Sequence, residues 1–316
     1  MTGLRILLTT FLLIAATLPA TAQSYPSRPI NMVVPFPPGG TTDIMGRALQ
    51  NELGKALGAT VVITNKGGAA GTIGMAEGAR AQGDGYTIAL TPNNPLTAQP
   101  HLQKLAYGID SFRYICLVYY APYVLIAGPQ APFKTFGEFL SFAKAKPENL
   151  VYGHPGPASQ GHLGMLAVLR AIGADALGVP FQGAGPMSHA LLSGTVMAIT
   201  ETPAVAQASN LPVLAALSQE RIPALPDVPT MRELRYPAEA FTAGGLVAPA
   251  GTPDGVVAVL EKACAQATAS EGYRTIVERL QTTPRYLPGT DFRKMFDDDS
   301  IQNAEAIRRA GLSASK

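Results

Sequence analysis

The chain has 316 residues, of which 47% are hydrophobic and 15% are charged, so it can bury a large core and lacks the composition of a disordered protein. Its formal net charge is only +2 and no block of Lys or Arg occurs, which excludes the usual signature of a protein that binds nucleic acid or an anionic membrane surface. The composition and charge are compatible with binding of a small neutral or anionic ligand. The length predicts two domains.

The first 22 residues have the pattern of a signal peptide. Arg5 precedes an apolar run over 6–18, and the small residues Ala20 and Ala22 stand at the cleavage positions. The run is short for a membrane span of about 20 residues, and no Cys lies near the cleavage site to carry a lipid. We therefore expect residues 1–22 to be removed and the mature chain to be exported as a soluble protein, with an uncleaved N-terminal anchor as the alternative.

The mature chain opens with strands and helices in alternation. An apolar strand is predicted over 30–36, and strands also over 60–66 and 85–92, with a Gly-opened helix over 67–82 between these two. After the first strand, apolar residues recur at the spacing of one helix face, at Met45, Leu49, Leu53 and Leu57. This order predicts a parallel sheet whose ligand-binding loops follow the strands.

A second α/β unit follows. A strand pair is predicted over 113–120 and 123–128, and a helix over 135–150 that starts at Thr135. Strands and helices then alternate over 150–155, 161–173, 176–182, 184–194, 196–202 and 213–218, before late helices over 252–270 and 290–311. No low-complexity linker separates the two units, which favours strands that cross between two hinged lobes.

The loop after the first strand, in the stretch VVPFPPGGTTDIMGRAL, is not a nucleotide loop. A GxxxxGK[ST] phosphate loop needs a Lys where Thr41 stands, and Gly39-Gly40 alone does not make a GxGxxG fingerprint. Backbone N–H groups at the start of the next helix, together with the helix dipole, still favour a negatively charged oxygen such as that of a carboxylate. Asp43 could instead cap that helix start itself.

Seven segments, in this order, resemble the Bug receptors, which are the substrate-binding proteins of tripartite tricarboxylate transporters. They are YPSRPINMVVPFPPGGTTDIMGRAL, TNKGGAAGTIGM, GDGYTIAL, GHPGPASQGHL, VPFQGAG, LPDVPT and LVAPAGTP. Together they span nearly the whole mature chain. The resemblance implies a periplasmic binding protein with two α/β lobes, similar to type II, that closes on a small ligand in the cleft between the lobes.

The resemblance also implies a set of ligand-binding residues, in which backbone N–H groups from both lobes hold one carboxylate. The first-lobe wall would comprise Phe36, Pro38, Gly39, Gly40, Thr41 and Asp43, and the second-lobe wall Gly183, Ala184 and Gly185. Ser159 and His162 are candidates for the distal end of the ligand, with a helix N-cap and a structural histidine as the alternatives. Asn93 and Glu201 complete the set, and turn chemistry is the alternative for Asn93.

Several positions depart from the family pattern. Gln182 stands where Lys is usual, Met197 where Asp is common, and Glu201 near a frequent second acid. Ala243 and Gly244 replace the usual aromatic pair. These departures leave the volume and polarity of the distal pocket open, so the ligand of a better-known relative does not transfer.

The lobes are expected to comprise residues 23–122 with 240–316, and residues 123–239. The helix over 252–270 would then pack on the first lobe, which places Cys116 and Cys264 in one lobe and makes a disulfide geometrically possible. Two buried thiols are the alternative.

The expected function is capture of a small organic carboxylate, or a carbonyl-bearing ligand, by interlobe closure and its delivery to membrane subunits of a transporter. The alternative is an extracytoplasmic sensor that contacts a signalling membrane protein. The chain has no GxSxG or HExxH motif and no paired Cys ligands, so we expect neither an enzyme nor a metal or cofactor site. The exported form is expected to be a monomer.

Overall fold

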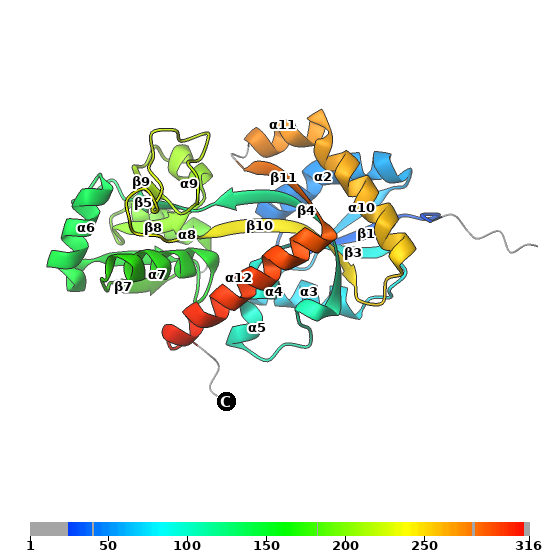
Figure 1. The fold of residues 1–316 in the computed structure, drawn as a ribbon, viewed down its shortest axis with the longest axis horizontal. Coiled ribbons are helices and arrows are strands. Elements are labelled where there is room, and N and C mark those ends of the chain that lie inside the picture. Colours follow the sequence, from blue (N-terminus) through cyan, green and yellow to red (C-terminus); the bar gives the residue numbers. More distant parts are fainter. Residues whose placement is uncertain (1–24, 40, 182, 280–281, 313–316) are drawn as a thin grey trace, which may run out of the picture.

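The computed structural model of the chain describes residues 25–39, 41–181, 183–279 and 282–312, and the predicted signal peptide lies outside them. Two sheets form the centres of two lobes, at the right and left of Figure 1. The first sheet has six strands, in the order β11 (Thr283–Pro288), β4 (Phe112–Pro122), β10 (Phe241–Pro249), β3 (Thr87–Pro92), β1 (Ile30–Val34) and β2 (Val61–Asn65). The second has five, in the order β7 (Leu177–Pro180), β6 (Val151–His154), β8 (Ala198–Glu201), β5 (Val124–Ala127) and β9 (Val213–Ala216).

The first lobe confirms the predicted β-α-β-α-β start, because β1 pairs in parallel with both β2 and β3. Its helices are α2 (Thr41–Leu57), α3 (Thr72–Arg80), α4 (Asn94–Thr97), α5 (Gln99–Leu102), α10 (Asp254–Ala269), α11 (Glu271–Arg279) and α12 (Gly289–Arg309). The predicted apolar face of α2 is buried as expected, with Met45, Leu49 and Leu53 fully inaccessible to solvent. That face and α10 enclose the main core of this lobe.

The second lobe has its own core beneath α6 (Phe136–Ala145), α7 (Gln160–Ile172), α8 (Ala184–Leu192) and α9 (Pro203–Ala208). Thr135 is the N-cap of α6, as predicted, and forms a reciprocal capping pair with Glu138. The helix ends at Ala145, earlier than the predicted 150, because Pro147 disfavours helical geometry at the residue before it and begins a short 3-10 turn.

The strands predicted as a pair over 113–120 and 123–128 belong to different sheets, because the chain passes from one lobe to the other between β4 and β5. At this crossing point three backbone hydrogen bonds connect three segments: Tyr123 N donates to Ala240 O (2.8 Å), Leu217 N to Tyr123 O (2.8 Å) and Ala240 N to Leu217 O (3.1 Å). In addition, the far end of α12 packs on α7, where Ile307 and Leu163 share a small apolar cluster.

The two cysteines form a disulfide within the first lobe. Cys116 on β4 bonds Cys264 on α10, with 6.5 Å between the Cα atoms, and both residues are fully buried. Of the two alternatives left open by the sequence, the structure therefore has the disulfide, and the predicted packing of the helix over 252–270 on the first lobe is confirmed.

Candidate ligand-binding site

The first-lobe loop joins β1 to α2 and is organised around Asp43. This carboxylate is 2% exposed and accepts hydrogen bonds from the Gly39 N–H (2.9 Å), Arg47 Nε (3.0 Å) and Asn65 Nδ2 (2.9 Å). Burial opposes its ionisation, yet these hydrogen bonds and the charge of Arg47 hold the pKa of Asp43 below its usual value. Asp43 therefore shapes the loop, and it also occupies the N–H of Gly39 that was predicted to face the ligand.

Of the other residues of this wall, one packs against the protein and the others are exposed to solvent. Phe36 is half-buried, with its ring against the backbone of Gly71, and its carbonyl accepts a hydrogen bond from Asn65 Nδ2 (3.0 Å). Pro38 and Thr41 are exposed. Gly40 lies outside the described residues. The accessible part of the described first-lobe wall is thus Pro38, Gly39 and the start of α2 at Thr41.

The second-lobe wall lies at the start of α8, where no side chain of the residues that the structure describes caps the helix. Gly183, the N-cap residue, has φ of +104°, a conformation that favours glycine. Ala184 and Gly185 are exposed, and a Cβ built on Gly183 or Gly185 would meet no atom within 4 Å. Among the described residues, no side chain accepts a hydrogen bond from the N–H groups at the start of this helix, and there is open space beside Gly183 and Gly185.

The side chains of Ser159 and His162 form hydrogen bonds within their own loop. Ser159 Oγ accepts from the His162 N–H (3.2 Å) and donates to Gly156 O (2.7 Å), which makes Ser159 the N-cap of α7. His162 Nδ1 accepts from the Ala158 N–H (3.0 Å), and its ring stacks on His154 with 3.9 Å between centroids. Burial, with a further contribution from His154, lowers the pKa of His162 to about 4. The contacts of Ser159 and His162 therefore match the alternatives named for them, a helix N-cap and a structural histidine.

Asn93 and Glu201 are also buried. Asn93 is fully inaccessible to solvent, and its Nδ2 donates to Asp299 Oδ2 (2.9 Å). This hydrogen bond connects the start of α4 to α12. The neighbouring Asn94 reaches across the lobes and donates to Ala158 O (2.9 Å). Glu201 is 8% exposed, accepts from the Thr202 N–H (2.8 Å), and has its pKa raised by burial.

Two features of the site escaped the sequence analysis. Asn65 organises the first-lobe loop, and its position at the end of β2, beside β1, is a signal that could have found it. Arg47 lies one turn after Asp43 on α2, and this spacing predicts an ion pair.

The hydrogen bonds of Ser159 and His162 bear on what these two residues can do chemically. Ser159 Oγ accepts from the backbone N–H of His162, and the imidazole Nδ1 is used by Ala158, so the two side chains do not form a nucleophile and base pair. In the described part of the chain, no group of three or more His, Cys, Asp or Glu side chains is arranged to hold a metal ion. No helix among these residues is long and apolar enough to cross a membrane.

Comparisons with known proteins identify the family of the chain. The profile described as "Tripartite tricarboxylate transporter family receptor" matches residues 45–312. BugT of Bordetella pertussis is 34% identical, over 93% of this chain and 92% of its own. The malate-bound structure of MatC from Rhodopseudomonas palustris is 31% identical and covers 90% of this chain and 100% of its own, with a TM-score of 0.76. An adipate-bound protein from the same organism is 25% identical, covers 92% and 99%, and has a TM-score of 0.81.

Proposed function

The chain belongs to the family of tripartite tricarboxylate transporter receptors, and from that premise we propose that it captures a small organic carboxylate by closing two lobes over it. The lobes comprise residues 23–122 with 240–316, and residues 123–239. The ligand class is supported by the relatives that hold malate and adipate. The loaded receptor acts as a monomer in the periplasm and delivers its ligand to the membrane subunits of a transporter.

The observation that carries the proposal is the uncapped start of α8. A carboxylate is costly to bury unless its oxygens accept hydrogen bonds, and charge-assisted bonds from N–H groups supply the compensation. Among the described residues, no side chain accepts from the N–H groups that follow Gly183, and the helix dipole adds partial positive charge at the same place. Ala184 and Gly185 have no long side chain to fill that space.

The first lobe contributes through the start of α2. Because Asp43 occupies the N–H of Gly39, the donors for the ligand come from the helix turn at Thr41. Pro38 offers an exposed apolar surface beside it. Glu201 remains a proposed contact for the distal end of the ligand, and burial raises the pKa of its carboxyl.

A thermal-shift screen tests the ligand class. The purified mature protein is heated with malate, adipate, citrate, benzoate, amino acids and adipamide, because a ligand bound only by the folded state raises Tm. We expect at least one carboxylate to raise Tm by several degrees. Adipamide has the shape of adipate without the charge and is the matched control. A larger shift with adipamide than with any carboxylate, or no shift with any carboxylate, would contradict the proposal.

A further inference from the structure

The two lobes also touch where the far end of α12 packs on α7. Four residues, none of them more than 5% exposed, share an apolar cluster there: Ala98 directly after α4, Ala158 directly before α7, Leu163 of α7 and Ile307 of α12. Beside the cluster, Asn94 Nδ2 of the first lobe donates to Ala158 O of the second lobe (2.9 Å). We call these five residues the back contact.

The back contact lies next to the segments that join the lobes. Gly164 follows Leu163 on α7, and a Cβ built on Gly164 would lie 3.0 Å from Ala240 Cβ and 3.5 Å from Leu217 Cδ2. Ala240 and Leu217 are two of the residues whose backbone hydrogen bonds connect the three segments at the crossing point. The helix α7 therefore packs against the pivot about which two hinged lobes rotate.

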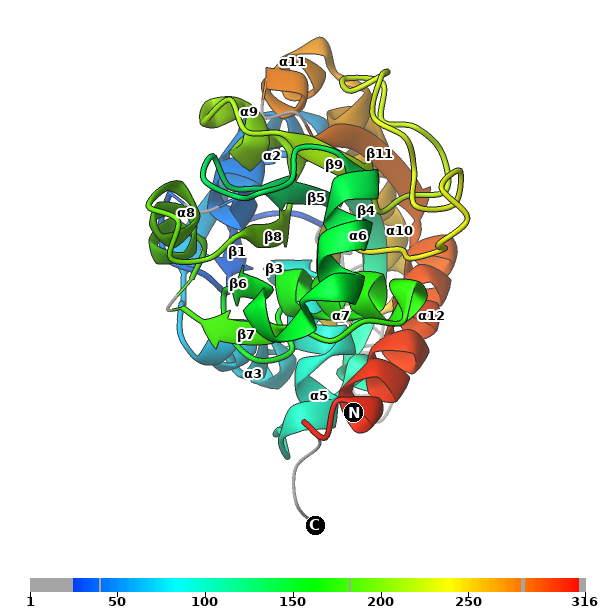
Figure 2. The same cartoon turned by 90° about the vertical axis from the view of Figure 1, so that its left-hand side faces the viewer.

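The start of α8 and the back contact lie on different sides of this pivot. Figure 2 looks from the second lobe toward the first, with α8 on the left, α12 on the right, and β4 and β5, between which the chain crosses, in the middle. Two bodies that rotate about a pivot approach each other on one side and separate on the other. Closure of the lobes over a ligand at the start of α8 therefore pulls α12 away from α7.

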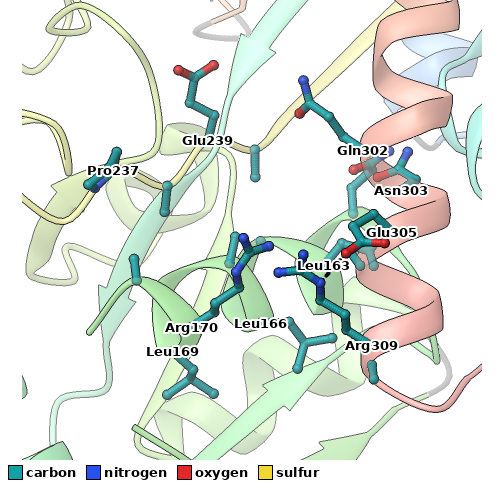
Figure 3. A pocket seen from close by; sticks show the side chains of 18 of the residues that line it. Leu163, Leu166, Leu169, Arg170, Pro237, Glu239, Gln302, Asn303, Glu305 and Arg309 are labelled. Carbon is teal, nitrogen blue, oxygen red and sulfur yellow. Dashed lines mark ion pairs between the residues drawn. The ribbon is translucent and has the colours of Figure 1, made fainter. Parts of the chain in front are cut away.

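A cavity beside the back contact gives this separation room. It measures about 890 Å³ and lies between α7 and α12, with Leu163 and Leu166 on one wall and Gln302 and Ala306 on the other (Figure 3). The two helices thus meet at the back contact and are apart beside it. Little other packing between α7 and α12 has to be broken when the lobes rotate.

The separation nevertheless costs free energy. It exposes the buried side chains of Leu163 and Ile307 to water, and it takes the Asn94 amide away from Ala158 O. A ligand that closes the lobes has to supply this free energy from its own binding. The back contact therefore favours the conformation in which the cleft is open.

We propose that the back contact holds the unloaded receptor open and sets the fraction of free protein that is closed. The proposal rests on the proposed function, in which the lobes close over a ligand. Because the closed form retains the ligand, a weaker back contact raises the closed fraction and the ligand affinity by the same factor. The five residues thus set the affinity from the far side of the pivot.

A distance measurement between the lobes, made without ligand, tests the proposal. Spin labels are attached to the mature protein through Asn51→Cys on α2 and His189→Cys on α8, two exposed positions. The native Cys116 and Cys264 do not react, because they form a buried disulfide. Pulsed electron–electron double resonance then gives the populations of long and short distances. We expect Ile307→Ala to raise the ratio of short to long distances at least tenfold.

Ile172→Ala is the matched control, since Ile172 is also buried and also lies on α7, but packs inside the core of the second lobe. It is expected to lower stability and to leave the distances unchanged. A shift as large as that of Ile307→Ala would refute a specific role for the back contact. Should Ile307→Ala fail to fold, Asn94→Ala takes its place, because it removes the hydrogen bond to Ala158 and should shift the distances in the same direction.

Two further outcomes would overturn the proposal. In the first, the distances are the same in wild-type protein, Ile307→Ala and Asn94→Ala, so the back contact does not bias the lobes. In the second, the variants lengthen the distances, which makes the back contact a feature of the closed form. No ligand is present, so a carboxylate screen without any hit, which would contradict the proposed function, does not decide this measurement.

Discussion

In the second lobe, the loops that lead into α7 and α8 follow neighbouring parallel strands, β6 and β7. The two loops differ in whether their backbone N–H groups donate to side chains. In the α7 loop, the N–H of Ala158 donates to the side chain of His162, and the N–H of His162 donates to the side chain of Ser159. In the α8 loop, Gly183 is the N-cap, and none of the described side chains accepts from the N–H groups at the helix start. Polar side chains in a loop can therefore satisfy its backbone donors, whereas a glycine-rich loop leaves its donors without a side-chain partner, and we propose that the ligand binds there.

The largest expected effect comes from the open loop. Gly183→Pro should lower carboxylate affinity at least a hundredfold, about 2.7 kcal/mol, because proline cannot adopt φ of +104° and the loop must move. Titration calorimetry with the best carboxylate of the screen measures the change, and circular dichroism checks the fold.

Gly156→Pro is the matched control in the α7 loop, since Gly156 also has positive φ (+117°) and open space around it. We expect it to change affinity by less than about threefold. Equal losses of affinity in the two variants would remove the distinction between the loops.

The second effect is a pH dependence of the filled loop. Folding lowers the pKa of His162 from its ordinary value of 6.5 to about 4, so the unfolded chain takes up the proton first as the pH falls. The free energy of unfolding should therefore decrease between about pH 6.5 and pH 4, by up to about 3 kcal/mol. In His162→Asn, whose oxygen can still accept from Ala158 but does not titrate, urea melts across this range should show a smaller decrease. An unchanged slope would contradict the assignment.

The third effect concerns the first-lobe loop. Asp43→Asn removes a buried acceptor from Gly39 and Arg47 and should lower the free energy of unfolding by about 1–3 kcal/mol at neutral pH. Because folding lowers the pKa of Asp43, this contribution is present above about pH 4 and is lost as the pH falls through the folded-state pKa. Urea melts at pH 7 and pH 3 measure it. Asp298→Asn breaks an exposed pair with Lys294 and is expected to leave stability unchanged; a similar loss there would refute the special role of Asp43.

The smallest effect is loss of a cap. Ser159→Ala should lower the free energy of unfolding by about 1 kcal/mol and leave carboxylate affinity within about threefold, since Ser159 serves α7. Thr135→Ala removes the equivalent cap of α6 and should cost a similar amount. If Ser159→Ala alone weakened binding strongly, Ser159 would be a ligand contact and the α7 loop would not be closed.

Much of the fold could be predicted from local patterns. The spacing of Met45, Leu49 and Leu53 identified the buried face of α2, and Thr135 identified the start of α6. These signals are contained in a few consecutive residues, so one sequence is enough to read them.

The strands β10 and β11 escaped prediction for a physical reason. Glycine is a weak strand former, yet β10 carries Gly244 and Gly245, because a Cβ at Gly244 would overlap the ring of Tyr119 and one at Gly245 would overlap Cys116 O. The same contact explains the missing aromatic residue at Gly244, since Tyr119 of β4 fills that space. β11 is short and contains two prolines, Pro284 and Pro288.

The site could be predicted as a set of loops but not as a set of contacts. The sequence places Asp43, Ser159 and Asn93 after the right strands. Ser159 bonds locally, to Gly156, whereas Asp43 and Asn93 bond to Asn65 and Asp299, which only the folded chain brings near. Whether a loop donor is free depends on these partners. Residue type and position alone do not decide it.

The central claim is that main-chain N–H groups of the open loops hold the ligand. A crystal structure of the protein with the best carboxylate of the screen tests it most directly. The account predicts a carboxylate oxygen within about 3 Å of N–H groups in the first turn of α8, with the start of α2 facing it. A carboxylate held instead by the side chains of Ser159 and His162, with the start of α8 empty, would contradict the account.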